Sequence, residues 1–329
     1  MRSPIFIISM PRSGSTLLQR ILLSHKAVGG TAEPWILLPL IYSKKSSGVL
    51  SEYSSRLSFK GVNDMLKEVP DAENVYNDRI KEFADGIYSK ILKNNEVYFL
   101  DKTPRYYLII DDLYKIYPEA KFVYLFRNPI NIYASILKTW CNNKFSKLYG
   151  NHNDLTIGVN KISEAYKRYK DNKNTISVRY EDLVSQPEEI IKDIQKFLEI
   201  NYDERLSKNF VNVKIDTKNN NVLGDPTGIE EYKSINSDTL NKWKNVFDTR
   251  FRKKILTRYI KNTLTKETLS IQGYNQEEII KEIKSLKNNG GLSIFSDAIH
   301  YFVYKLIIRF NLYNFWSKDM NWIKNRFIS

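Results

Sequence analysis

Residues 5–18 contain the residue types of an anion-binding loop. An apolar run rich in β-branched residues, 5–10, is followed by Pro11 and Gly14 and then by a helical pattern that starts near Ser15. A tight turn that leads into a helix points backbone N–H groups and the positive end of the helix dipole at one small volume. The segment therefore predicts a site for an anionic group. An ordinary strand-to-helix turn, with Ser13 as the helix cap, is the alternative interpretation.

A second pair of residues has a spacing that suits a phosphate group. Arg127 follows the apolar run 121–126, and Ser135 stands eight positions later in a helical pattern. A guanidinium makes a forked contact with phosphate, and a hydroxyl near a helix start adds a donor. Taken singly, Arg127 could be a cap after a strand and Ser135 a small residue at a helix contact. No lysine precedes Ser15, as a Walker A loop would require, so the pattern lacks the usual means of binding a γ-phosphate with magnesium.

Strands that alternate with helices are predicted to position these residues. Apolar runs at 5–10, 98–100, 121–126 and 175–179 each precede a turn and a helical pattern. Helical periodicity is clearest in residues 78–92, 108–117, 130–137, 156–169 and 187–198. This alternation is typical of a parallel sheet in an α/β fold. The irregular stretches 34–77 and 142–153 are our candidates for acceptor binding, because long excursions from an α/β core usually cover the active site.

The composition limits the classes of protein to which the chain can belong. Its 329 residues are 42% hydrophobic, which is ample for a packed core. The net charge of +14 favours anionic partners, although solvated surface lysines explain much of it. One cysteine excludes an internal disulfide, and the three histidines are not clustered, so no metal site is predicted. We expect a cytoplasmic protein, because the N-terminus lacks a signal-peptide pattern and Lys305 and Arg309 interrupt the apolar stretch 298–316.

Together the two motifs resemble those of the sulfotransferase family, which uses 3′-phosphoadenylyl sulfate (PAPS) as sulfuryl donor and releases 3′-phosphoadenosine 5′-phosphate (PAP). The resemblance implies a P-loop NTPase-like α/β fold, with a parallel sheet flanked by helices. It assigns the 3′-phosphate to Arg127 and Ser135. It implies a loop for the 5′-phosphosulfate group made of Pro11, Arg12, Ser13, Gly14, Ser15, Thr16 and Leu17. No metal is needed, because a sulfuryl group carries less negative charge than a terminal phosphoryl group.

Weaker matches extend the resemblance to about residue 243. Glu33 stands after the first helix, where related enzymes carry a catalytic glutamate, and is implied as the general base. Lys102 lies in the segment DKTPR, which resembles the lysine segment that approaches the transferring group in the tyrosylprotein and carbohydrate branches. With Arg12, Lys102 would stabilise charge on the leaving oxygen. Further nucleotide contacts are implied for Tyr180, Lys233 and Lys242, the last two unranked.

The chain departs from the better-known branches of the family. Its first loop carries Arg12 where the cytosolic aryl and steroid enzymes typically use a lysine, and the only histidine near Glu33 is His25, in the predicted first helix. We expect no N-terminal membrane anchor of the kind that the Golgi enzymes carry. We therefore expect a soluble, bacterial-type enzyme that acts on a hydroxyl or amine of an unidentified acceptor, whether a small molecule, a carbohydrate or a lipid-like alcohol.

Two other functions stay open on the sequence: a kinase or nucleotide triphosphatase with a degenerate loop, and a non-enzymatic protein that binds anions or membranes. No nucleic-acid partner is predicted. The double glycine at 290–291 favours a sulfotransferase domain of residues 1–289 and a C-terminal helical extension of residues 290–329. Helical spacing in 298–316 gives no clean basic stripe, so core packing or a homodimer contact is favoured there over peripheral membrane contact.

Overall fold

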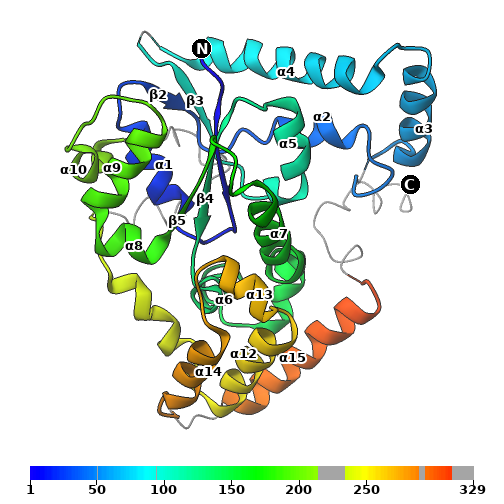
Figure 1. Ribbon diagram of the computed structural model, residues 1–329. Helices are drawn as coiled ribbons and strands as arrows, with labels where there is room; N and C mark the ends of the chain where they lie inside the picture. Colours follow the sequence, from blue (N-terminus) through cyan, green and yellow to red (C-terminus); the bar gives the residue numbers. More distant parts are fainter. Residues whose placement is uncertain (50, 94, 214–233, 289–292, 313–329) are drawn as a thin grey trace. The chain divides into compact units, whose positions relative to one another are not determined.

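Five short runs of the chain form one parallel sheet in the computed structural model, which describes residues 1–49, 51–93, 95–213, 234–288 and 293–312 (Figure 1). The strands are β1 (Ile5–Ser9), β2 (Val28–Gly30), β3 (Tyr98–Asp101), β4 (Lys121–Phe126) and β5 (Thr175–Arg179). Their order is β2-β3-β1-β4-β5, and every pair is parallel. Strands β1, β3 and β4 are buried along their whole length, which explains their mostly continuous apolar sequences. The predicted parallel α/β sheet is confirmed, and β2 is an additional short edge strand.

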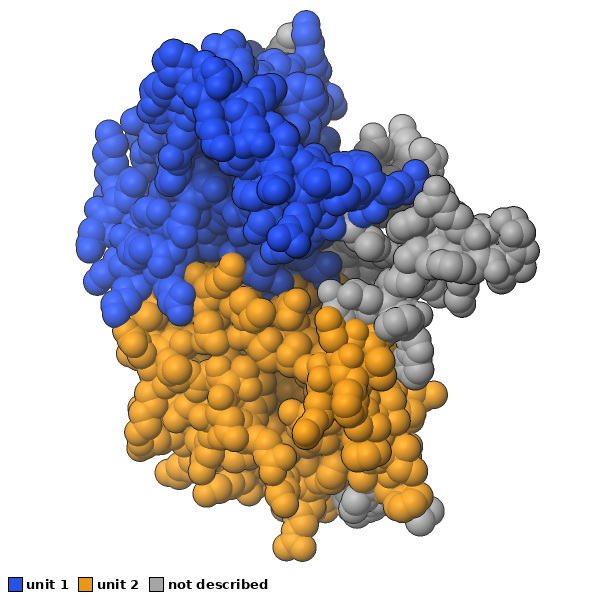
Figure 2. Space-filling model, turned by 90° about the vertical axis from the view of Figure 1, so that its right-hand side faces the viewer, with its two compact units in different colours: residues 1–126, 164–236 blue, residues 127–163, 237–329 orange. Residues whose placement is uncertain are grey.

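The sheet belongs to one of two units into which the chain divides, coloured separately in Figure 2. Unit 1 comprises residues 1–126 and 164–236, and unit 2 comprises residues 127–163 and 237–329. The chain leaves unit 1 at the end of β4 and returns to it within α7 (Val159–Tyr169). The expected separation of residues 1–289 from residues 290–329 stays a prediction.

The helices of unit 1 flank the sheet on both faces. In Figure 1, α1, α8, α9 and α10 lie on one side of the strands and α5 lies on the other. Tyr114 of α5 stacks on Phe122 of β4, with ring centroids 3.7 Å apart, so aromatic packing joins α5 to this face of the sheet. The helices are α1 (Ser15–Leu23), α2 (Leu37–Tyr42), α3 (Ser55–Leu66), α4 (Ala72–Ile91), η1 (Tyr106–Leu108), α5 (Ile110–Ile116), α8 (Tyr180–Ser185), α9 (Pro187–Phe197), α10 (Leu206–Asn209) and η5 (Phe210–Asn212).

The regular elements of unit 2, within its described residues, are all helices. Its elements are α6 (Pro129–Ser135), η2 (Ile136–Trp140), η3 (Phe145–Asn151), η4 (Asp154–Gly158), the first part of α7, η6 (Asp238–Asn245), α12 (Arg250–Asn262), α13 (Lys266–Ile271), α14 (Gln276–Ser285) and α15 (Ser293–Arg309). One face of α15 packs on η3 and α12, as the core-packing interpretation of this segment requires. Within the described ranges, no helix has both the length and the apolar character needed to cross a bilayer.

Candidate functional site

The loop between β1 and α1 has the backbone of an anion-binding turn. Arg12 and Gly14 adopt left-handed conformations, with φ of 65° and 93°, on either side of Ser13. The Ser13 N–H donates to the Met10 carbonyl at 3.2 Å, which closes the turn, and α1 begins at Ser15. The N–H groups of a first helical turn have no carbonyl partner within the helix, and successive N–H groups in such a turn form a concave anion site. The loop geometry therefore suits an anion at the start of α1.

Gly14 is required by its neighbour as well as by its backbone conformation. A Cβ atom at this position would overlap the ring of Tyr180, because that ring lies directly against the loop. Tyr180 is the first residue of α8 and is completely buried. The structure thus places Tyr180, predicted to lie near the nucleotide, in contact with the loop predicted to hold its 5′ end.

Two buried hydroxyl groups next to the turn have no hydrogen-bond partner among the described residues. They are the Oγ atoms of Ser9 and Ser13, whose side chains are 3% and 0% exposed. A buried donor left unsatisfied costs about 1–3 kcal/mol. A ligand oxygen in the loop would supply an acceptor and remove this cost. The orphaned Ser13 hydroxyl is therefore consistent with an oxygen-rich anion in the loop.

A buried ion pair joins two of the predicted catalytic residues. Lys102 Nζ lies 2.6 Å from Glu33 Oε1, and the two side chains are 2% and 9% exposed. Glu33 Oε2 accepts a hydrogen bond from Trp35 Nε1 at 3.0 Å, so both carboxylate oxygens are held. Glu33 follows β2 and Lys102 follows β3, and the register of this pair sets Gly30 opposite Leu100. The two residues meet because neighbouring parallel strands end at the same edge of the sheet.

The first helix also holds the segment that carries Glu33. Gln19 of α1 donates from Nε2 to the carbonyl oxygens of Thr31 and Ala32, at 2.7 and 2.8 Å. Gln19 is 1% exposed, so these bonds are shielded from water. The helix whose N-terminus forms the anion loop therefore also fixes the backbone next to Glu33.

Asp101, the last residue of β3, anchors the ion pair through a connected set of hydrogen bonds. Its Oδ2 accepts from the hydroxyls of Tyr88 and Tyr106, each at 2.7 Å, and its Oδ1 accepts from Thr103 Oγ1 at 2.9 Å. Thr103 Oγ1 accepts the backbone N–H of Trp35 at 3.2 Å. Trp35 has φ of 56°, an unfavourable conformation for a bulky residue that this contact helps to hold. One buried carboxylate thus ties together both segments of the ion pair.

Burial sets the protonation of this anchor. It raises the pKa of Asp101 to about 6, although the three hydroxyl donors act in the opposite direction. Burial also raises the pKa of Tyr88 and Tyr106 well above their usual value, so both remain hydrogen-bond donors at neutral pH. Above about pH 6, an ionised Asp101 accepts from three hydroxyls at once.

Arg127 and Ser135 flank α6 in unit 2. Arg127 follows β4 directly and is 7% exposed, and Asn128 caps the helix by accepting the N–H of Ile130 at 3.2 Å. Ser135 is the last residue of α6 rather than a residue near its start, and the chain continues into the π-helical segment η2. Turns of π-helix are rare and frequently occur at functional sites. The predicted role of this pair at a 3′-phosphate stays a prediction.

Lys233 and Lys242 were both predicted to contact the nucleotide, without a ranking between them. The structure describes only Lys242. It lies in η6 of unit 2 and is exposed, next to the buried Trp243. Lys233 lies outside the described residues. Within those residues, no cluster of three or more His, Cys, Asp or Glu side chains could hold a metal ion.

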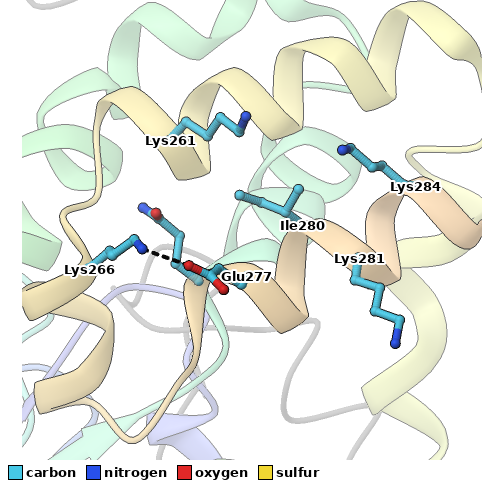
Figure 3. Close-up of a pocket in the computed structure, with 7 residues that line it drawn as sticks. Lys261, Lys266, Glu277, Ile280, Lys281 and Lys284 are labelled. Atoms are coloured by element: carbon cyan, nitrogen blue, oxygen red, sulfur yellow. Dashed lines mark hydrogen bonds and ion pairs between the residues drawn. The ribbon is translucent and has the colours of Figure 1, made fainter.

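Unit 2 also contains a basic pocket that sequence reasoning did not single out. It has a volume of about 630 Å³ and lies between the end of α12 and the face of α14 (Figure 3). Lys261 and Lys284 extend from the two helices toward one another above Ile280, and Lys266 pairs with Glu277 at 2.7 Å. The repeated lysines in the sequences of these two helices were the evidence from which the pocket could have been predicted. Only the packing of α12 on α14 brings these lysines together.

Sequence reasoning also missed the support of the ion pair. It weighed Lys102 but not the preceding Asp101. The signal available was an acidic residue at the end of an otherwise apolar strand, Tyr98–Asp101. Such a carboxylate is buried only if it finds donors, and these come from the distant Tyr88 and from Tyr106.

Comparisons of sequence relate the chain to known proteins. The model of a family described as "Sulfotransferase family" matches residues 4–204. The chain is 33% identical over 141 residues to the nodulation protein NoeE of Sinorhizobium fredii, an alignment that covers 41% of this chain and 31% of that protein. It is 27% identical over 247 residues to protein-tyrosine sulfotransferase A of Caenorhabditis elegans, covering 73% of this chain and 60% of that one. The chain thus spans less than a third of NoeE and about three fifths of the nematode protein.

A solved structure shares the fold. It is the sulfotransferase domain from the curacin biosynthetic pathway, with a TM-score of 0.52 and 19% identity over 88% of this chain and 99% of that domain. At this level of identity, the structural likeness supports the P-loop NTPase-like α/β architecture. It carries no argument about substrates.

Proposed function

The chain belongs to the sulfotransferase family, and we propose that it transfers a sulfuryl group from PAPS to a hydroxyl or amine of an acceptor without using a metal ion. The observation that carries this proposal is the combination, at one edge of the sheet, of an anion loop with an orphaned Ser13 hydroxyl and a buried Glu33–Lys102 pair. A nucleotide triphosphatase would need a lysine before Ser15, and the chain lacks it.

Two groups of residues would hold the donor. Residues 11–17 would bind the 5′-phosphosulfate group through backbone N–H groups, the Ser13 hydroxyl and the guanidinium of Arg12. Tyr180, packed on Gly14, would keep the loop in its binding conformation. Arg127 and Ser135, with Lys233 or Lys242, would bind the 3′-phosphate, the group that distinguishes PAPS and PAP from ATP and ADP.

Glu33 and Lys102 would carry out the proton transfer and the charge stabilisation. The donor supplies the sulfuryl group and an oxygen leaving group that departs with PAP. Glu33 would accept the proton of the acceptor hydroxyl or amine as the new bond to sulfur forms in line with the breaking sulfur–oxygen bond. Lys102 and Arg12 would stabilise the negative charge that develops on the leaving oxygen. The anchor at Asp101 would keep Glu33 and Lys102 in place through this step.

Nucleotide binding tests the donor assignment. We expect PAP to raise the thermal unfolding temperature clearly, and ADP and ATP at equal concentration to raise it little, because Arg127 and Ser135 have no 3′-phosphate to contact in those nucleotides. Equal stabilisation by ADP would contradict the assignment and favour the nucleotide triphosphatase alternative. Chelators should leave both PAP binding and turnover unchanged.

An acceptor screen with labelled PAPS tests the reaction itself. Tyrosine-containing peptides come first, because one relative is named a protein-tyrosine sulfotransferase, followed by carbohydrates, lipid alcohols and small phenols. A labelled product formed only with the intact Glu33–Lys102 pair would support the mechanism. We also propose a cytoplasmic location, which is compatible with the single cysteine, Cys141, being reduced and buried.

A further inference from the structure

Helix α15 turns Asp297 and His300 toward the rest of unit 2. Asp297, which is 3% exposed, forms an ion pair with Arg252 of α12, with distances of 2.7 and 2.9 Å. One turn further along, His300 Nδ1 lies 2.9 Å from Ser146 Oγ of η3. This packed face is completed by Tyr304, which is 8% exposed. The helix is therefore fixed to unit 2 largely through polar and aromatic contacts.

The opposite face of α15 is apolar and exposed. Phe295, Ile299 and Phe302 are 77%, 48% and 62% exposed, and Phe310, directly after the helix, is 62% exposed. At 100° per residue the first three project within a narrow stripe, about half a turn away from Asp297. With about 200 Å² per aromatic side chain, the three phenylalanines alone present roughly 400 Å². Apolar patches of this size on a protein surface are often interaction sites.

Cationic residues border this stripe along one edge. Lys305 and Arg309 are both exposed, and neither forms an ion pair with a described carboxylate. Lys305 lies over the ring of Tyr301, 5.7 Å from its centroid, so its long side chain covers the helix surface while its ammonium group stays in water. An exposed apolar stripe edged by long cationic side chains allows a helix to lie in a membrane interface, with the apolar residues inserted and the cations at the headgroups.

Charge favours an anionic membrane over a second copy of the chain as the occupant. Two copies joined through this stripe would bring together two chains with a net charge of +14 each, with Lys305 and Arg309 at the contact. Anionic headgroups would instead neutralise these two residues. The lysines of the basic pocket, Lys261, Lys281 and Lys284, add to the positive charge of the same unit (Figure 3). At 17 residues, α15 is about 25 Å long, which suits a position in the plane of the interface.

We propose that α15 docks the protein on anionic membranes, with Phe295, Ile299 and Phe302 inserted at the acyl boundary and Lys305 and Arg309 on the phosphate headgroups. This inference is independent of the proposed enzymatic function. It predicts binding that requires both the apolar stripe and the cationic edge.

Vesicle flotation with the full chain tests this inference. We expect wild type to float with phosphatidylcholine–phosphatidylserine vesicles and only weakly with phosphatidylcholine alone. Phe295→Ser/Phe302→Ser should lower the affinity by about tenfold or more. Lys305→Gln/Arg309→Gln should lower the affinity for phosphatidylserine-containing vesicles by about tenfold and so remove the preference for them.

The matched control is Leu57→Ser/Phe83→Ser, which removes two apolar residues of unit 1 that are 68% and 53% exposed and should leave vesicle binding unchanged. All these side chains are exposed, so the variants should unfold at wild-type temperature. Failure of wild type to float with either vesicle, or equal flotation of the Phe295→Ser/Phe302→Ser variant, would overturn the proposal. So would light scattering that shows a wild-type dimer which this variant converts to a monomer, because the stripe would then be an interface between copies.

Discussion

Replacing Glu33 by glutamine separates the proton transfer from the structural support that this side chain gives. The amide keeps one oxygen that can accept from Lys102, as Oε1 does now at 2.6 Å. Its NH₂ group would then face the indole N–H of Trp35, so the 3.0 Å hydrogen bond at Oε2 is lost. With the counter-charge of the buried ammonium also removed, we expect unfolding to become easier by about 1–3 kcal/mol.

The effect on turnover is separate from this loss of stability. An amide cannot accept a proton, so kcat at saturating donor should fall by about 100- to 10,000-fold, the range for a positioned base. PAP affinity, measured by calorimetry, should change by less than about twofold, because Glu33 is not among the residues proposed to hold the nucleotide. The assay follows labelled sulfuryl transfer to an acceptor found in the screen, with circular dichroism to confirm folding.

Two further variants make the result interpretable. Trp35→Phe removes only the indole donor and should lower kcat by less than about tenfold. If Glu33→Gln unfolds, Glu33→Gln/Lys102→Met removes both buried charges and should regain stability while turnover stays low. A folded Glu33→Gln protein with near-normal turnover would refute the reasoning and leave Glu33 as the structural partner of Lys102.

Three other changes test the surrounding contacts. Arg127→Ala should weaken PAP binding by about 2–4 kcal/mol in calorimetry, through loss of a charge-assisted contact, whereas a loss confined to kcat would contradict its role at the 3′-phosphate. Gly14→Ala should lower the unfolding temperature and abolish PAP binding, since its Cβ overlaps Tyr180 and its φ of 93° disfavours any side chain; wild-type affinity would contradict this. The raised pKa of Asp101, about 6 against 3.8, means that this carboxyl favours the folded state fully below pH 4 and loses that contribution, about 3 kcal/mol, as pH rises through 6. The unfolding free energy of wild type relative to Asp101→Asn should therefore fall by about 2 kcal/mol between pH 4 and pH 7, and a pH-independent difference would refute the assignment.

Prediction from sequence succeeded where the signal is local. Residues 5–18 form a contiguous strand, turn and helix start, and their glycine and apolar run indicate this conformation without reference to the rest of the chain. Their role in binding an anion stays a prediction. The parallel order of buried strands also follows from continuous apolar runs separated by helical patterns. Element boundaries were less accurate: α4 begins at Ala72 rather than near residue 78, and the stretch 34–77 contains helices α2 and α3.

The sequence by itself determined a parallel α/β sheet with a strand, tight turn and helix start at residues 5–18, predicted there an anion-binding loop, and named Glu33 and Lys102 as candidates. Tertiary structure alone decided that these two residues, 69 positions apart, form one buried ion pair held by Asp101. It also decided that α15 turns Asp297 inward and its phenylalanines outward. The physical reason is that pairing depends on strand register and burial depends on which face of a helix finds a neighbour, and both are properties of contacts between distant segments.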